Sequence, residues 1–251
     1  MSSILLTFTP LHLQYSHFHG AEIWVTFFVT AIVLLSIYLY RFKSLPSANA
    51  PPFCKGTLPR VFLIGVLVGL ATASKFTAVF VCVVPLVVFG VLQFERNLQV
   101  PKGRQRRIGS LAEVLSLVST MGLSAIFTFR IFQPYAFDGL GKLSQSFMSD
   151  LDYLEAVNTG GNYPWVVQWV GRTTLLYPFE SIFWSGMGPA LTIAVCAGLV
   201  LATIEVIRNE KFVLLAPLSF IAVMVGLVTQ QFNPLIRYLL PMYPTAIVFG
   251  G

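Results

Sequence analysis

The sequence predicts an all-α polytopic membrane protein, and three observations support this fold class. Hydrophobic residues make up 56% of the 251 residues and charged residues only 10%, whereas a soluble domain carries about 25% charged residues. Seven apolar stretches follow one another along the chain. The loops between them alternate between basic and acid-bearing. A chain of this kind can bury its apolar surface only against lipid and against itself.

The apolar stretches predict about seven membrane segments, and their limits are set by charged or proline-rich residues. They run over about 22–40, 61–73, 76–92, 111–129, 181–207, 212–228 and 238–251. The loop before the second segment and the loop after the third are both basic, so both should lie on the same side of the membrane. We therefore expect the two segments to form a hairpin that turns near Lys75. Both of its arms are short for a bilayer core of about 30 Å, so we expect local thinning or a shallow hairpin. A lysine at the turn avoids the cost of a charge at the bilayer centre, about 2.5–3.5 kcal/mol or more.

The distribution of charge predicts the orientation of the bundle. The three basic loops hold four, five and two Lys or Arg, which is eleven of the sixteen in the chain. Basic residues collect in cytoplasmic loops, so the long loop 131–180 is predicted to lie outside the cytoplasm. The net charge of +6 follows from this topology, and we expect no nucleic-acid partner. The protein is predicted to be integral to the membrane, the plasma membrane if it is prokaryotic.

We expect one transmembrane domain over residues 1–251, with the long loop inside it. Apolar residues open the chain at Met1 without the basic start of a signal peptide, and an apolar run closes it at Gly251. Both ends favour a fragment of a longer membrane protein.

Six charged residues are predicted to gather on the outer side, most of them at helix ends: Glu22, Lys75, Arg130, Asp138, Arg172 and Arg237. Cations beside a carboxylate suit a reaction on an anionic lipid head group, because the cations would bind phosphate and the carboxylate a proton, a metal or a hydroxyl. Each cation taken singly is also explained by snorkelling to the interface. His19 and Glu22, three residues apart, are the weak candidates for metal ligands, and whether a divalent ion is a cofactor stays open.

Four segments resemble the lipid-carrier-dependent glycosyltransferases of the GT-C fold, the group that includes protein O-mannosyltransferases and aminoarabinose transferases. The fourth reads Arg-Tyr-Leu-Leu-Pro-Met-Tyr-Pro, similar to the start of a helix in that family. The segments are 10–28, 69–77, 130–139 with 168–173 and 177–178, and 237–244.

The resemblance implies a GT-C-like helical bundle fragment that uses membrane lipid and a polyprenyl-phosphate sugar donor as partners. The donor would pass a hexosyl or pentosyl group to a glycan, lipid or protein acceptor outside the cytoplasm. Glu22 matches the family's second acidic position, which organises the catalytic site, although Asp is commoner there. Lys75 and Arg237, with Arg130 and Arg172 as lesser candidates, match positions suited to the carrier phosphate. The base of the reaction would lie in an earlier loop that precedes Met1, so the isolated chain is expected to be inactive. A transporter or flippase for a lipid-linked substrate and a non-catalytic membrane scaffold remain as alternatives.

Overall fold

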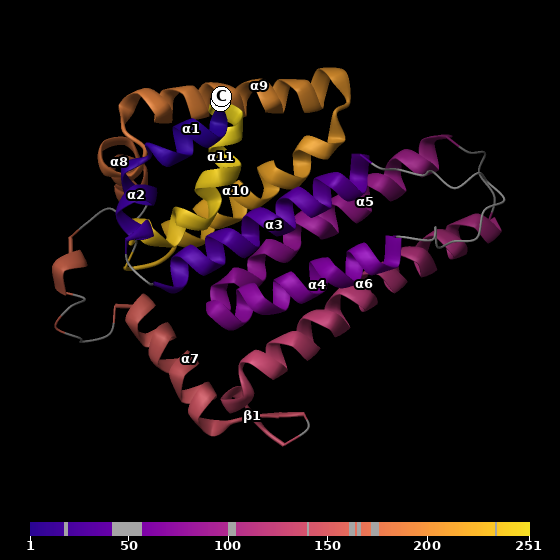
Figure 1. Ribbon diagram of the computed structural model, residues 1–251, viewed down its shortest axis with the longest axis horizontal. Coiled ribbons are helices and arrows are strands. Elements are labelled where there is room, and N and C mark those ends of the chain that lie inside the picture. Colours follow the sequence, from indigo (N-terminus) through magenta and orange to yellow (C-terminus); the bar gives the residue numbers. More distant parts are fainter. Residues whose placement is uncertain are drawn as a thin grey trace.

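The computed structural model of the chain is a helical bundle (Figure 1). It describes residues 1–17, 20–41, 57–99, 104–139, 141–160, 164, 167–171, 176–233 and 235–251. Its α-helices are α1 (Ser2–Thr7), α2 (Pro10–Ser16), α3 (Ala21–Arg41), α4 (Thr57–Ser74), α5 (Val83–Gln99), α6 (Arg104–Phe132), α7 (Gln145–Asn158), α8 (Tyr177–Ser181), α9 (Pro189–Asn209), α10 (Leu215–Thr229) and α11 (Tyr243–Gly250).

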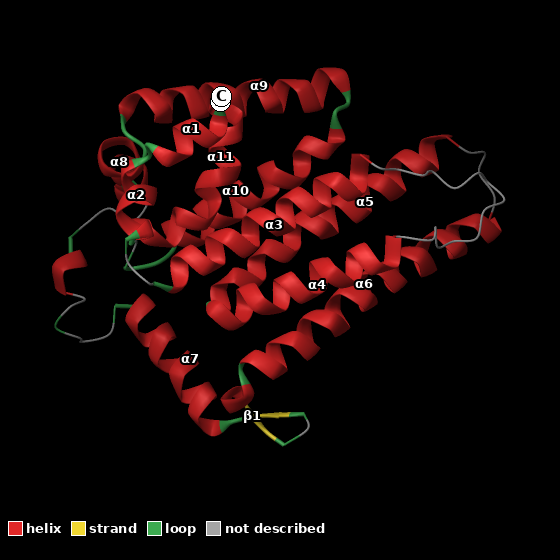
Figure 2. Ribbon diagram, in the orientation of Figure 1, coloured by secondary structure: helices red, strands yellow, loops and turns green. Residues whose placement is uncertain are grey.

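Short segments complete the described chain. Five are 3₁₀ helices: η1 (Phe76–Cys82), η2 (Pro134–Ala136), η3 (Val167–Trp169), η5 (Phe212–Leu214) and η6 (Ile236–Met242). One is a turn of π-helix, η4 (Ile182–Gly186). The strands β1 (Phe137–Asp138) and β2 (Lys142–Leu143) pair antiparallel, with Phe137 opposite Leu143, and form the small hairpin of Figure 2.

Six helical segments in the described part of the chain are long and apolar enough to cross a membrane, which confirms the all-α membrane class. They are Ala21–Arg41, Thr57–Ser74, Phe76–Glu95, Ala112–Phe132, Pro189–Asn209 and Phe212–Thr229. The seventh predicted span, 238–251, is not among them. It consists of most of η6, which contains Pro241, and of the eight-residue helix α11.

The bundle has two ends that differ in what lies there (Figure 1). At one end α3 and α5 finish, α4 and α6 begin, and α9 turns into α10; we call it the basic-loop end. At the other lie the start of α3, the turn between α4 and η1, the end of α6 and η6; we call it the Lys75 end. The long segment between α6 and α9 also lies at the Lys75 end, as the alternation of basic loops predicts.

The predicted hairpin at Lys75 forms, but its arms are longer than expected. Helix α4 has 18 residues because Pro59 falls in its first turn, where proline is tolerated. The other arm runs over Phe76–Glu95, 20 residues. At 1.5 Å per residue, 18 residues span about 27 Å, which is closer to the bilayer core of about 30 Å than the predicted arms would be.

The predicted span 181–207 is wrong at its beginning. Residues 182–186 form the π-turn η4, and Gly188 then adopts a φ of 83° before α9 starts at Pro189. A φ in that range suits glycine alone among common residues. The break separates α9 from the segment before it and leaves a 21-residue span.

Glycines let α4 and α6 approach each other closely. A Cβ at Gly65 would overlap Ser124 and the backbone of Met121, and one at Gly69 would come within 2.5 Å of the Ala125 carbonyl oxygen and 2.7 Å of Thr128 Cβ. Small residues four apart are a common means of close packing between membrane helices. This seam fixes the helix that ends immediately before Lys75.

An aromatic cluster attaches the long segment to the bundle at the Lys75 end. The ring of Phe147, on α7, makes edge-to-face contacts with Phe76, Phe129 and Tyr135, with ring centroids 5.9–6.3 Å apart. Ser144 caps α7, since its hydroxyl oxygen accepts from the Phe147 N–H at 3.1 Å. The long segment is therefore held close to the residue that follows Lys75.

Candidate functional site

Glu22 is the acidic residue of the first turn of α3. A carboxylate is favoured there because the helix N-terminus carries a partial positive charge. The Thr26 hydroxyl donates to the backbone carbonyl of Glu22 at 2.7 Å, which leaves the side-chain oxygens for other partners. The side chain is 14% exposed, so this acid is mostly withdrawn from water.

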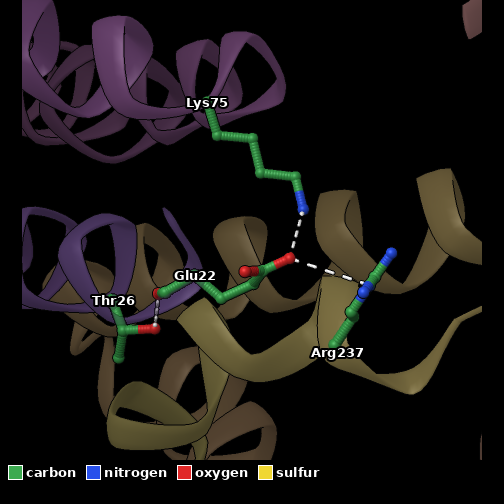
Figure 3. A network of polar contacts seen from close by, with 4 residues as sticks. All are labelled: Glu22, Thr26, Lys75 and Arg237. Atoms are coloured by element: carbon green, nitrogen blue, oxygen red, sulfur yellow. Dashed lines mark hydrogen bonds and ion pairs between the residues drawn. The ribbon is translucent and has the colours of Figure 1, made fainter. Parts of the chain in front are cut away.

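Lys75 occupies the break between the two arms of the hairpin. Its backbone is extended, with φ −158° and ψ 121°, and its carbonyl accepts from the Ala78 N–H at 2.8 Å. The Gln133 side-chain amide donates to the carbonyl of Ala73 and so ties the turn to the segment after α6. The lysine side chain is 24% exposed and is directed back toward the bundle (Figure 3).

Arg237 is the second residue of η6, which packs against α3. Leu235, in an extended conformation, precedes this 3₁₀ segment and accepts a hydrogen bond from the Tyr238 N–H at 3.0 Å. The Arg237 side chain is 42% exposed. It is therefore the most open of the three charged groups that meet here.

Glu22, Lys75 and Arg237 form one cluster, although they lie far apart in the sequence (Figure 3). The same carboxylate oxygen, Oε1, is 3.3 Å from Lys75 Nζ and 3.7 Å from Arg237 Nε. The Tyr238 ring lies beneath both cations, 4.2 Å from Lys75 Nζ and 5.6 Å from the Arg237 guanidinium carbon. Two cations thus share one carboxylate, and the three residues together carry one surplus positive charge.

The surroundings shift the pKa values of Lys75 and Arg237 in opposite directions. Burial lowers the pKa of Lys75, and Arg237 lowers it further, while Glu22 raises it without cancelling the effect of burial. Burial also acts to lower the pKa of Arg237, but Tyr238 and Glu22 outweigh it and raise that pKa. Arg237 is therefore a permanent cation, whereas Lys75 is a cation that gives up its proton more readily than an exposed lysine.

A cleft of about 440 Å³ opens beside Arg237. It is lined by Tyr153, Leu154, Val157, Gln168, Asn233, Leu235, Arg237 and Tyr238. Lys75 and Tyr238 also line a narrow pocket of about 20 Å³, room for about one water molecule, whose other walls are Val25, Val29, Thr77, Ala78, Phe220, Met224 and Pro241. Arg237 therefore faces a cleft that several polar side chains line, and Lys75 faces a small pocket whose other walls are mainly apolar.

Arg130, also predicted to bind phosphate, has partners other than this cluster. Its guanidinium donates to the Gly139 carbonyl and lies 4.9 Å from the centre of the Phe137 ring. These contacts hold the hairpin of β1 and β2 against the end of α6. Arg130 Nη1 is buried and has no hydrogen-bond partner among the described residues.

Two predicted site residues, Arg172 and His19, lie outside the described residues. The pairing of His19 with Glu22 on a metal therefore stays a prediction. Within the described part of the chain, no group of three His, Cys, Asp or Glu side chains is placed to hold a metal ion.

Tyr238 and Gln133 are the contributors that sequence reasoning missed. Tyr238 follows Arg237 directly, and its proximity could have raised it as a candidate, but the face it presents depends on the 3₁₀ geometry of η6. Gln133 lies in the segment 130–139 that carries the family resemblance, but nothing in the sequence pairs its side chain with the carbonyl of Ala73.

Comparison with family models, with curated proteins and with solved structures finds no match to this chain.

Proposed function

We propose that the chain belongs to a membrane glycosyltransferase that takes a hexosyl or pentosyl group from a polyprenyl-phosphate donor and passes it to an acceptor hydroxyl at the extracytoplasmic face. The observation that supports this most is the convergence of Lys75 and Arg237, from two separate segments, on the single carboxylate of Glu22. Paired cations beside an open cleft suit a ligand whose anionic centre is joined to a polar group.

The charges match the electrostatic needs of sugar transfer. The acceptor oxygen forms a bond to the anomeric carbon, the bond from that carbon to the phosphate oxygen breaks, and the acceptor proton passes to a base. Negative charge grows on the departing phosphate, so fixed cations in a partly dry site lower the barrier. Lys75 and Arg237 are the groups that would meet this charge.

Glu22 is a poor choice for the base of this reaction. A carboxylate with two cations within 4 Å of one oxygen is stabilised in its ionised form and has little tendency to take a proton. Its role in the proposal is to hold the two cations in register. This agrees with the organising role that the family resemblance implies for Glu22.

The arrangement of polar and apolar walls supports a lipid-linked donor. Arg237 lines the larger cleft, Lys75 lines the apolar pocket, and Tyr238 lines both. A lipid-linked sugar has the same order of parts: a polar sugar, an anionic phosphate and an apolar chain. The apolar pocket has room for about one water molecule, so a polyprenyl chain would lie outside it or widen it.

The test is sugar transfer by the protein at its full natural length in proteoliposomes, with polyprenyl-phosphate-linked hexose or pentose as donor. Release of free polyprenyl phosphate with formation of a glycosylated product supports the proposal. Movement of intact donor across the membrane without product would identify a flippase instead. Absence of both activities and of donor binding would favour a scaffold and overturn the proposal.

A further inference from the structure

We infer that the cleft beside Arg237 binds the sugar group of the donor, and that Asn233 is a specificity-determining residue that hydrogen-bonds a sugar hydroxyl there. The inference rests on the proposed function, which names the donor but not where its sugar lies.

The cleft has the size and composition of a small-molecule site. Its volume of about 440 Å³ falls in the usual range of about 300–1,000 Å³ for such sites. One wall comes from Tyr153, Leu154 and Val157 on α7, and the turn before η6 supplies Asn233 and Leu235. Arg237 and Tyr238 close the side that adjoins the ion cluster. A phosphate held by Arg237 would therefore place the group attached to it in or beside the cleft.

Asn233 carries an unused hydrogen-bonding group. The residue is only 7% exposed, and its side-chain Oδ1 atom is buried and has no hydrogen-bond partner among the described residues. Buried side-chain oxygens of this kind are nearly always bonded. Because Oδ1 is an acceptor, it needs a donor such as a hydroxyl group, and the residue lines the cleft where such a group would arrive.

The turn that carries Asn233 is fixed to α7, so this wall is already formed without a ligand. The Phe232 N–H donates to the Asn158 carbonyl at 3.0 Å. Gly160 lies under the Phe232 ring, which a Cβ at that position would approach to 3.3 Å, and its φ of 86° is one that glycine accepts readily. A preformed wall lowers the ordering cost of binding.

The remaining walls fit a sugar better than a purely apolar ligand. Gln168, which is exposed, offers both an amide donor and an acceptor at the cleft. Tyr153, 44% exposed, adds an aromatic ring to the lining. The side-chain amides of Asn233 and Gln168 can hydrogen-bond hydroxyl groups, and Arg237 beside them can bind an anion. Together they suit a ligand that has hydroxyl groups next to a single anionic centre. A sugar joined to phosphate has this chemistry.

The experiment compares three probes on the full-length protein in lipid nanodiscs: a polyprenyl phosphate without sugar, the same carrier linked to a hexose, and the same carrier linked to a pentose. Dissociation constants are measured for wild type, Asn233→Ala, Arg237→Ala and a control, Asn209→Ala. Asn209 is a suitable control because it is an asparagine far from the cleft. It is the last residue of α9, and its side-chain amide donates to Glu205 at the basic-loop end.

We expect wild type to bind one sugar-linked carrier about tenfold more tightly than the bare carrier, a preference that a few hydrogen bonds can supply. Asn233→Ala should remove most of that preference and leave the affinity for the bare carrier unchanged. Arg237→Ala should weaken all three probes, and Asn209→Ala none. Equal weakening of all three probes by Asn233→Ala, or no effect, would overturn the inference.

The two proposals fail in different ways. If wild type binds neither bare nor sugar-linked carrier, the proposed function fails. If it binds the bare carrier and prefers no sugar, only the assignment of the cleft fails. Should Asn233→Ala not give a monodisperse protein, Gln168→Ala, an exposed position, decides by the same criterion: the preference must fall while the affinity for the bare carrier holds.

Discussion

The bundle has an exposed ion pair near one end and a cluster of three charged residues near the other, and the two differ in position, exposure and net charge. At the basic-loop end, Lys211 Nζ lies 2.7 Å from Glu205 Oε2, with the two side chains 59% and 38% exposed. At the Lys75 end, Glu22 meets Lys75, which is 53 residues away in the sequence, and Arg237 from a third segment. The pair forms across a single helix end, whereas the cluster exists only when three segments have packed.

The shorter pair is the less informative one. Exposed pairs contribute little to stability and are screened by salt. Glu205 and Lys211 also balance each other and leave no charge for a ligand. The Glu22 cluster has longer contacts, one surplus cation and a cleft beside it. Two of its three side chains, Glu22 and Lys75, are less exposed than either side chain of the surface pair. We therefore expect substitutions in the cluster to lower the rate of sugar transfer. The matched substitutions at Glu205 and Lys211 should leave that rate almost unchanged.

The largest effect should come from Lys75→Ala. Removing a cation that meets the charge of the transition state should lower the rate of sugar transfer by about 10²–10³-fold, by analogy with the loss of one oxyanion-hole donor. Lys211→Ala is the matched control and should leave the rate unchanged. Initial rates with the lipid-linked donor measure both. A Lys75→Ala protein with wild-type turnover would remove Lys75 from the site.

Glu22→Gln should have the next largest effect, a fall in transfer of about 10–100-fold. The neutral amide no longer holds two mutually repelling cations in register, and small displacements of positioning groups are costly to rate. Glu22→Asp, with a shorter arm but the same charge, should retain more activity than Glu22→Gln. Glu205→Gln is the control at the other end. If Glu205→Gln and Glu22→Gln had equal effects, the distinction between the pair and the cluster would be lost.

The sequence predicts the membrane class and the presence of Glu22, Lys75 and Arg237 at one end of the bundle. Both predictions rest on properties of long stretches of chain and not on single contacts. Hydropathy over about twenty residues identifies a span, and the alternation of basic loops decides at which end each charge lies. The break at Gly188 escapes such averages, since it depends on one backbone angle in an otherwise apolar run. Hydropathy also treats 238–251 as one span, although Pro241 lies within a 3₁₀ segment there.

The sequence could not separate Arg130 from the cluster or bring Tyr238 into it. Arg130, Lys75 and Arg237 are all cations at predicted helix ends, so sidedness groups them equally. Their partners depend on side-chain direction: Arg130 reaches back to Gly139 and Phe137, while Lys75 lies over Tyr238. Contacts of this kind are fixed by tertiary packing and leave no periodic signal.

The close packing of α4 against α6 at Gly65 and Gly69 should make the fold sensitive to added side-chain volume there. Gly69→Ala should lower the free energy of unfolding by about 1–3 kcal/mol, the usual cost of overpacking, because its Cβ would collide with Ala125 and Thr128. Gly122→Ala is the control, since a Cβ there meets nothing within 4 Å. Thermal unfolding in detergent gives the stability difference. Equal melting temperatures for the two variants would show that α4 and α6 have room for a methyl group at Gly69.

The smallest effect is a pH dependence, and it comes from Lys75 alone. Binding of a phosphate diester probe requires the ammonium form, and burial lowers the pKa of Lys75 below its ordinary value of 10.5. Affinity should therefore fall as the pH rises through the folded-state pKa, before an ordinary lysine would lose its proton. Stability should change in the opposite direction. Between the folded-state pKa and 10.5 the unfolded chain binds more protons at this group, so the free energy of unfolding rises with pH across that window.

Lys75→Arg separates this titration from others in the same range. A guanidinium stays protonated throughout, so the variant should lose both trends even if its affinity at neutral pH is lower than that of wild type. Glu22, Arg237 and Tyr238 face Lys75 and remain in place in this variant, so any trend that they cause would persist. Lys211→Arg should change neither trend, because the surface pair takes no part in binding. A fall in affinity with pH that survives in Lys75→Arg would assign the titration to a neighbour, and an affinity that stays flat up to pH 10.5 in wild type would show that the probe does not need the Lys75 charge.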